Sequence, residues 1–348
     1  MITFFKILFS PLSFIYGFVI FLRNYLFDKN IFKQRKVNAK IISVGNLTVG
    51  GSGKTPAVIS LIKMLKPESK VGVLSRGYGR KTSGYLLVRD NDKFLQNVDA
   101  AGDEIYLVAD EGKIPAAVSE KRFEGATKFL KDVDLDIIVL DDAYQHRWIH
   151  RDLNILIFDQ RFLRKNNSIE KNLLPLGIMR EGFRSVNRTD LIIINRKFSA
   201  KQNIPSQLWK YLPNKKLFYA YYFANGIVDV KTHQVYSLND FEGQNSLVVC
   251  GIAKPFSFIK ALEDSNINTK NKIVFKDHKD YNIKEIELIR KKFYETNSHS
   301  VLTTQKDAVK LSEFSNELDD IDIYYLKIEM KFEDEKNLVT TINQIIKK

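Results

Sequence analysis

The chain is 348 residues long, its formal net charge is +13 at pH 7, and 44% of its residues are hydrophobic. This length holds two domains with a sizeable core, and the balance of apolar and charged residues is typical of a globular protein. The positive charge favours an acidic partner, such as a nucleotide, a nucleic acid, an anionic lipid or a phosphorylated sugar, whereas the single cysteine, Cys250, excludes an internal disulfide and a zinc finger.

The N-terminal stretch predicts a membrane anchor. Residues 7–22 carry no charge, and as a helix they would measure roughly 24 Å, short of the ~30 Å hydrocarbon core of a bilayer. The basic residues that follow are typical of the cytoplasmic side of a membrane; they are Arg23, Lys29, Lys33, Arg35, Lys36 and Lys40. We expect a short spanning or half-inserted anchor in residues 1–36. A buried core helix and a signal peptide are the alternatives, although no small-residue cleavage site precedes the basic residues.

A strand, a glycine-rich turn and a helix follow in residues 41–65. Residues 41–44 are an apolar run typical of a buried strand, and residues 57–65 have a helical pattern. In the turn between them, GNLTVGGSGKTP, the glycines let backbone N–H groups converge on an anion, and the helix N-terminus adds partial positive charge. We therefore predict a phosphate-binding loop. The usual spacing would put a glycine at Thr48, so an ordinary glycine-rich turn is the alternative.

Such a loop specifies its contacts with a nucleotide. Lys54 would reach the β- and γ-phosphates, and the Thr55 hydroxyl would bind Mg²⁺. The residues expected to contact the nucleotide are Thr48, Val49, Gly50, Gly51, Ser52, Gly53, Lys54 and Thr55.

Other predicted strands also end in polar residues. The strand at residues 71–74 leads into SRGYGR at residues 75–80, a loop suited to an anionic or sugar ligand. The strand at residues 136–140 ends in Asp141 and Asp142, a suitable place for Mg²⁺. Asp103 precedes a predicted helix at residues 104–109, where by itself it would be an N-cap.

The alternation of strands and helices predicts a P-loop NTPase-like α/β fold with a doubly wound, mainly parallel sheet. Ligands of such sheets bind beyond the C-terminal ends of the strands. We expect the anchor in residues 1–36, a core domain in residues 37–200 and a smaller α/β domain in residues 201–348, whose terminal helix could pack back on the core. The strands expected after residue 200 are 217–223, 247–249, 273–275, 301–304 and 323–326.

At this point the chain resembles the tetraacyldisaccharide 4′-kinase family of lipid A biosynthesis. The matching segments are VGNLTVGGSGKTP at 44–56, LSRGYGR at 74–80, GDE at 102–104, LDDAYQH at 140–146, LLPLGIMRE at 173–181, GIAKPFSF at 251–258, DHKDY at 277–281 and TTQKDAVK at 303–310. A missing glycine at Thr48 is normal in this family. The chain departs from the family pattern at Ile105, Ala143, Tyr144 and residues 176–178.

The resemblance implies transfer of the ATP γ-phosphate to the 4′-hydroxyl of a lipid A disaccharide 1-phosphate, with ATP and Mg²⁺ as cofactors. It implies a monomer at the cytoplasmic face of the bacterial inner membrane, with an anionic membrane glycolipid as substrate. Nucleic acid is not an expected partner, because basic residues are not interleaved with aromatic ones outside the anchor.

The resemblance also implies roles for individual residues. The catalytic candidates are Asp103, His278, Lys54 and Asp142, with Asp103 accepting the hydroxyl proton and His278 orienting it across the cleft between the domains. Thr55, Asp141 and Glu181 are the expected metal ligands. Contacts with the substrate are expected from Ser75, Arg76, Tyr78, Arg122, His146 and Arg180.

A membrane-associated P-loop switch ATPase is the alternative function. It would share the phosphate loop, the Mg²⁺ site and the anchor, and it would act through a protein partner. It would not need a general base placed for a sugar hydroxyl.

Overall fold

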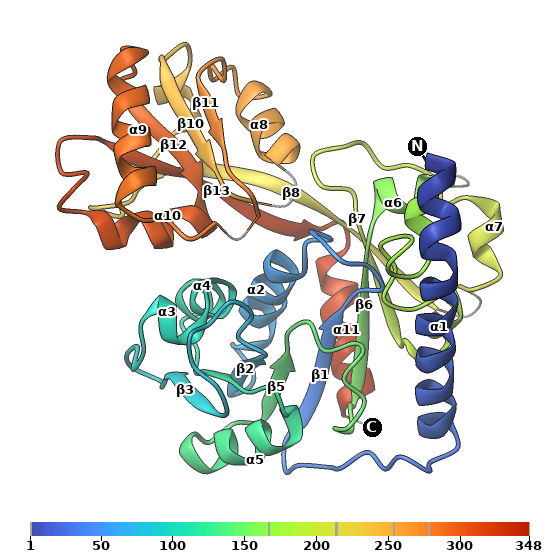
Figure 1. Ribbon diagram of the computed structural model, residues 1–348. Helices are drawn as coiled ribbons and strands as arrows, with labels where there is room; N and C mark the ends of the chain where they lie inside the picture. The colour runs from blue at the N-terminus through green and yellow to red at the C-terminus, as the bar shows by residue number, and fades with distance from the viewer. Residues whose placement is uncertain (1, 166–167, 213–214, 253–254, 278, 348) are drawn as a thin grey trace.

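A computed structural model describes residues 2–165, 168–212, 215–252, 255–277 and 279–347, without the side chains of residues 2–8. The strands form one continuous sheet, in which β9 pairs with β8 beside the main path. In Figure 1 the sheet runs from a small C-terminal lobe into the larger core. The predicted α/β fold is therefore confirmed.

The core contains the predicted doubly wound sheet. In spatial order its strands are β7 (Leu191–Asn195), β6 (Leu153–Asp159), β1 (Lys40–Gly45), β5 (Ile137–Leu140), β2 (Val71–Ser75), β4 (Ala116–Val118) and β3 (Leu86–Arg89). Neighbouring strands are parallel, except that β3 is antiparallel to β4. The predicted bounds agree closely because these strands are short apolar runs, as expected for strands covered on both faces.

Helices cover both faces of the core sheet. One face packs against α2 (Lys54–Leu65), α4 (Asp103–Gly112) and α11 (Glu335–Ile346). The other face packs against α5 (Arg122–Asp132), whose Phe129 joins a separate apolar cluster with Leu74 and Ile138. The shorter helices are α3 (Val98–Ala101), α6 (Gln160–Arg164), α7 (Ser206–Trp209), η1 (Ile169–Lys171), η2 (Phe183–Arg188), η3 (Leu238–Phe241) and η4 (Ser312–Phe314).

The C-terminal lobe adds the parallel strands β11 (Lys272–Val274), β10 (Ser246–Cys250) and β12 (Ser300–Thr304) and the helices α8 (Pro255–Glu263), α9 (Ile283–Glu295) and α10 (Gln305–Leu311). Two long antiparallel strands, β8 (Lys216–Asp229) and β13 (Ile323–Phe332), join this lobe to the core; β9 is Val235–Tyr236. The sequence analysis did not identify α9, and it made both joining strands too short. The division of the chain at residue 200 stays a prediction.

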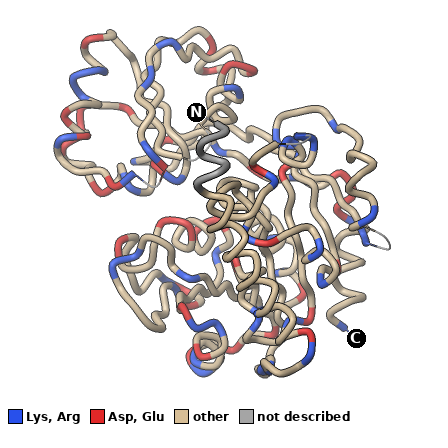
Figure 2. The backbone as a smooth tube through the Cα atoms, turned by 45° about the vertical axis from the view of Figure 1, so that its right-hand side comes forward, with Lys and Arg blue, Asp and Glu red and all other residues tan. Residues whose placement is uncertain are grey.

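The predicted N-terminal anchor forms the long helix α1 (Ile2–Asp28). By length and composition, its segment Phe9–Asp28 could cross a membrane. The helix runs along the core (Figure 1), and one side of it, which includes Ser13 and Phe27, is buried. The opposite side exposes Phe14, Ile15 and Phe18, with Phe14 77% exposed. Figure 2 brings α1 forward and shows that Lys and Arg are spread over both lobes.

Candidate active site

The predicted phosphate loop connects β1 to α2 and is constrained by glycine. Gly53 has φ 93°, and a Cβ there would collide with the Asn195 side chain and lie 2.5 Å from the Tyr222 hydroxyl. Asn195 Nδ2 donates a hydrogen bond to the Ser52 carbonyl (3.1 Å), and Lys197 Nζ donates one to the Gly51 carbonyl (3.0 Å). The side chains around this loop thus come from the end of β7, from Lys197 just after it and from β8. The sequence analysis did not recognise these contacts.

The other side of the loop pairs with residues 173–181, which we call the bridging segment. The Val49 N–H donates to the Ile178 carbonyl at 2.8 Å, and the Arg180 N–H donates to the Leu47 carbonyl at 2.7 Å. These two bonds flank Thr48, so the loop is fixed by backbone contacts on this side also.

Lys54, Asp142 and Arg180 meet beside the loop. Lys54 Nζ lies 3.6 Å from Asp142 Oδ1, and Arg180 Nη1 lies 2.9 and 3.0 Å from the two Asp142 oxygens. Burial by itself would raise the pKa of Asp142, but the charges of Lys54 and Arg180 outweigh this effect and hold the pKa below its ordinary value. The group is therefore a carboxylate held between two cations that could also face a phosphate.

Asp141 has a different environment. It is 1% exposed, and its Oδ1 atom has no hydrogen-bond partner within the described part of the chain. Burial, together with the carboxylates of Glu104 and Asp142, raises the pKa of Asp141 to about 7. A divalent cation would satisfy this buried oxygen and favour its ionised form.

A metal site here would need more than protein ligands. Across the described ranges, no group of three or more His, Cys, Asp or Glu side chains could hold a metal ion. Mg²⁺ usually takes one or two carboxylates and completes its octahedron with water and phosphate oxygens. Asp141 and the hydroxyl of Thr55 fit that requirement, whereas a closed all-protein metal cage does not.

Glu181, the third expected metal ligand, is engaged elsewhere. Its side chain is fully buried, and Oε1 pairs with Arg23 of α1 at 2.9 Å. Its Oε2 atom accepts from Asn24 (3.1 Å) and Ser185 (2.6 Å) and pairs with Arg188 (2.7 Å). Both oxygens are thus occupied by donors, two of which fasten α1 to the core. Metal ligation by Glu181 stays a prediction.

Asp103 lies at the boundary between the two lobes. Gly102, not Asp103, is the N-cap of α4, so the expected capping role is wrong. Lys310 Nζ of α10 lies 3.1 Å from Asp103 Oδ2, and Lys306 Nζ lies 3.6 Å from the same atom. Lys306 also pairs with Glu104 at 3.2 Å.

His278, the other expected catalytic residue, lies outside the described residues. The Lys310 ammonium donates to the Lys279 carbonyl at 3.0 Å while it pairs with Asp103. Lys310 therefore contacts both Asp103 and Lys279, the residue that follows His278 in the sequence. The sequence analysis quoted the motif that contains Lys306 and Lys310 but assigned no role to either residue.

The candidate substrate contacts differ in burial. Ser75 and Arg122 are buried, whereas Tyr78 is exposed. Burial lowers the pKa of Arg122 to about 10, although the charges of Asp141 and Asp142 oppose this effect. The charge of Arg122 acts on Asp141 and Asp142, so this arginine contributes to the electrostatics of the same site.

His146 is neutral over a wide range of pH. Burial lowers its pKa to about 4, and the positive charges of Arg122, Arg151 and Arg76 act in the same direction. A neutral imidazole can both donate and accept a hydrogen bond. Together with Lys54 and Arg180, the arginines whose charges act on His146 make this edge of the sheet cationic.

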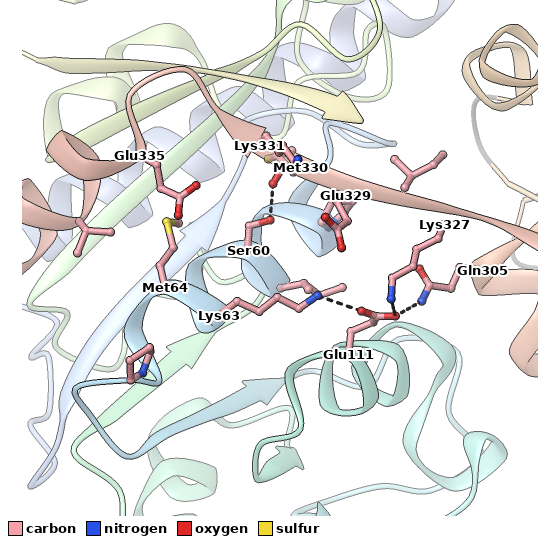
Figure 3. Close-up of a pocket in the computed structure, with 15 residues that line it drawn as sticks. Ser60, Lys63, Met64, Glu111, Gln305, Lys327, Glu329, Met330, Lys331 and Glu335 are labelled. Atoms are coloured by element: carbon pink, nitrogen blue, oxygen red, sulfur yellow. Dashed lines mark hydrogen bonds and ion pairs between the residues drawn. The ribbon is translucent and has the colours of Figure 1, made fainter. Parts of the chain in front are cut away.

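A separate groove of about 520 Å³ runs along α2, between the core and β13. Neither Lys54 nor Asp142 lines it. Figure 3 shows Glu111 of α4 at one end, where it accepts a hydrogen bond from Gln305 (2.6 Å) and lies 3.1 Å from Lys63 and 3.6 Å from Lys327. The contacts of Glu111 with Gln305 of α10 and Lys327 of β13 join the core to the C-terminal lobe.

Known proteins share the sequence and the fold of this chain. The family model described as tetraacyldisaccharide-1-P 4′-kinase matches residues 5–347. The tetraacyldisaccharide 4′-kinase of Phocaeicola vulgatus is 35% identical over 92% of this chain and 89% of its own length. The kinase of the same name from Aquifex aeolicus is 31% identical over 96% of this chain and 97% of its own. A crystal structure of LpxK from Aquifex aeolicus in complex with ATP has a TM-score of 0.81 at 30% identity, covering 98% of this chain and 99% of that one.

Proposed function

The chain belongs to the tetraacyldisaccharide-1-P 4′-kinase family, and we propose that it transfers the γ-phosphate of ATP to the 4′-hydroxyl of tetraacyldisaccharide 1-phosphate. It is a kinase of lipid A biosynthesis. The observation that carries the proposed reaction is the meeting of Lys54, Asp142 and Arg180 beside the phosphate loop. The ATP complex of the structurally similar LpxK supports ATP as the nucleotide of this chain.

The cations and the loop have separate tasks in this reaction. Backbone N–H groups of residues 48–55 would hold the phosphates, and Lys54 would neutralise charge that develops on the transferred group. The Asp142 carboxylate orients the Lys54 and Arg180 side chains. Charge stabilisation of this kind is the main contribution that a protein makes to phosphoryl transfer.

We propose Mg²⁺ as the cofactor, held by Asp141 and Thr55. The buried Asp141 oxygen that lacks a partner among the described residues supports this assignment. When bound, the ion would neutralise phosphate charge. The structure does not favour Glu181 as a ligand, because four donors occupy its carboxylate.

Asp103 is our proposed general base for the 4′-hydroxyl, and His278 is its proposed partner. The position of Asp103 supports this role. Its carboxylate lies at the boundary between the lobes, beside Glu104 and within reach of lysines of α10, so contact between the lobes would complete the surroundings of the base. In this role Asp103 would accept the hydroxyl proton, and the lysines would stabilise its ionised form.

We also propose that α1 lies in the membrane surface and does not span the bilayer. Its inner side is bonded to the core from Ser13 to Asn24, which would prevent the helix from crossing a bilayer without the core. Its outer side is apolar, and a basic stretch follows it. In this position at the membrane surface, α1 would bring a monomer to its glycolipid substrate at the cytoplasmic face of the inner membrane.

One experiment separates this function from a P-loop switch. The purified protein is incubated with γ-labelled ATP and a bacterial lipid extract, and the lipids are separated afterwards. Label in a glycolipid is the result expected of the kinase. Release of labelled inorganic phosphate without any labelled lipid would favour the switch ATPase.

A further inference from the structure

The inner side of α1 is bonded to the bridging segment at two points of its backbone. Ser13 Oγ donates to the Leu173 carbonyl at 2.7 Å, and Tyr16 Oη donates to the Arg180 carbonyl at 3.0 Å. Gly17 keeps this contact close, because a Cβ there would lie 2.8 Å from Leu173 Cδ1. A shift of α1 would therefore displace the bridging segment.

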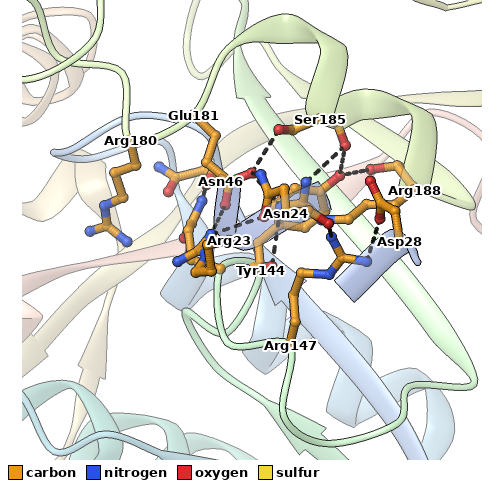
Figure 4. Close-up of polar contacts among 12 residues, drawn as sticks. Arg23, Asn24, Asp28, Asn46, Tyr144, Arg147, Arg180, Glu181, Ser185 and Arg188 are labelled. Atoms are coloured by element: carbon orange, nitrogen blue, oxygen red, sulfur yellow. Dashed lines mark hydrogen bonds and ion pairs between the residues drawn. The ribbon is translucent and has the colours of Figure 1, made fainter. Parts of the chain in front are cut away.

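Glu181 strengthens this attachment at the end of the segment (Figure 4). Its carboxylate joins Arg23 and Asn24 of α1 to Ser185 and Arg188 of η2. Burial by itself would raise the pKa of Glu181, but Arg188, Ser185 and Arg23 hold it below its ordinary value. The carboxylate therefore stays ionised and keeps α1 fastened across the neutral pH range.

The bridging segment is in turn bonded to the phosphate loop. The Ile178 carbonyl and the Arg180 N–H pair with Val49 and Leu47 on either side of Thr48. Arg180 is the residue at which the contacts converge, because its carbonyl accepts from α1, its N–H donates to the loop and its guanidinium binds Asp142. Asp142 is the partner of Lys54.

We propose that Glu181 is a positioning residue that couples the seating of α1 on an anionic lipid surface to the geometry of the phosphate loop, so that membrane contact tightens nucleotide binding. This inference rests on the proposed function. The outer side of α1 meets the lipid, and every step from its inner side to Lys54 is a direct contact. Ordering α1 at the membrane would order the loop before nucleotide arrives, and the linkage is reciprocal.

The test compares nucleotide affinity in the absence and presence of vesicles. The full chain is titrated with a fluorescent ATP analogue, alone and with vesicles of equal parts phosphatidylglycerol and phosphatidylethanolamine. We expect vesicles to lower the Kd of the wild-type protein about fivefold or more, the lower end of common coupling effects. Glu181→Gln and Tyr16→Phe should lose most of this shift while sedimenting with the vesicles as the wild type does.

Tyr25→Phe is the matched control. Tyr25 lies on the outer side of the same helix and is 46% exposed, so removing its hydroxyl should leave the vesicle-dependent shift intact. Tyr16→Phe deletes a single hydroxyl, and it carries the test alone if Glu181→Gln does not fold.

Three results would overturn the coupling. They are a wild-type Kd that vesicles do not change, an equal shift in Glu181→Gln, Tyr16→Phe and the wild type, and a Tyr25→Phe protein that loses its shift together with Tyr16→Phe. Each of these leaves the kinase assignment intact. Failure of the wild-type protein to bind the nucleotide under either condition would overturn the kinase function and the coupling with it.

Discussion

The ammonium of Lys310 lies 3.1 Å from the carboxylate of Asp103, and this ion pair joins the C-terminal lobe to the core. Both side chains are largely buried. The pair brings a residue of α10 to the first turn of α4, beside the proposed general base. It therefore offers a direct test of whether the lobe contact supports catalysis.

Replacing Lys310 with methionine should lower kcat roughly 10- to 100-fold, which corresponds to about 1.4–2.7 kcal/mol in the barrier. The reason is that Asp103 loses a cation that lies 3.1 Å from its carboxylate. The phosphate loop is unchanged, so the KM for ATP should change little. Steady-state kinetics with saturating lipid measures both. Lys310→Arg, which keeps the charge, is the control, and equal losses in the two variants would argue against an electrostatic role.

Lys54→Ala should abolish most phosphoryl transfer in a folded protein. A loss of a few kcal/mol of transition-state stabilisation is expected, on the order of 10²–10⁴ in rate. Single-turnover transfer of labelled phosphate measures the loss, and circular dichroism verifies the fold. Lys63→Ala, on the same helix but paired with Glu111 away from the loop, is the control. A kcat near the wild-type value in Lys54→Ala would contradict the assignment.

Gly53→Ala should destabilise the protein by about 2–4 kcal/mol, because the new Cβ meets Asn195 and Tyr222 and the backbone has positive φ. Urea unfolding measures the free energy. Gly51→Ala in the same loop is the control, since a Cβ there meets nothing within 4 Å. If both variants unfold at the wild-type urea concentration, the loop is less tightly held than its contacts indicate.

His146 should make the folded protein less stable as the pH falls. Its pKa is about 4 when folded, below the ordinary value of 6.5, so the unfolded chain binds more protons between these values. The contribution of His146 to stability is therefore complete above pH 6.5 and is lost as the pH falls toward 4. Urea unfolding of His146→Asn across this range should show a weaker pH dependence than the wild type shows.

The matched control for this measurement is His233→Asn, because His233 is exposed in a turn. Because this variant keeps His146, it should keep the pH dependence that His146 causes. A His146→Asn curve parallel to that of the wild type would mean that burial does not depress the pKa of this imidazole.

The outer side of α1 should account for membrane binding. Replacing both Phe14 and Phe18 with serine removes two exposed aromatic side chains, each contributing about 1.5–3 kcal/mol when fully buried in an apolar phase. Co-sedimentation with anionic vesicles should fall steeply, while thermal stability in solution should not change. Phe223→Ser, an exposed residue of β8, is the control. Undiminished sedimentation of the double variant would place the membrane contact elsewhere.

The parts of the fold that could be predicted are those in which the local pattern of apolar residues determines the conformation. The strands at residues 41–44, 71–74 and 191–194 are apolar runs, which determine their own conformation and burial. The long strands β8 and β13 were predicted too short, because their burial changes along their length as they pass from one lobe to the other. The helix α9 has a regular apolar spacing at Ile286, Ile289 and Phe293 that a closer examination of the sequence would have found.

The sequence by itself determined the strand–loop–helix unit around Lys54, the cationic character of the chain, the apolar helix at its start and the family to which it belongs. Only the tertiary structure decided the partners of the charged residues. Glu181 and Asp141 are both acids in segments that resemble the family motifs. One is nevertheless saturated by four donors, and the other has an oxygen without a partner among the described residues. The reason is physical: backbone conformation follows from neighbouring residues, whereas the solvation and pairing of a carboxylate depend on distant segments that packing brings to it.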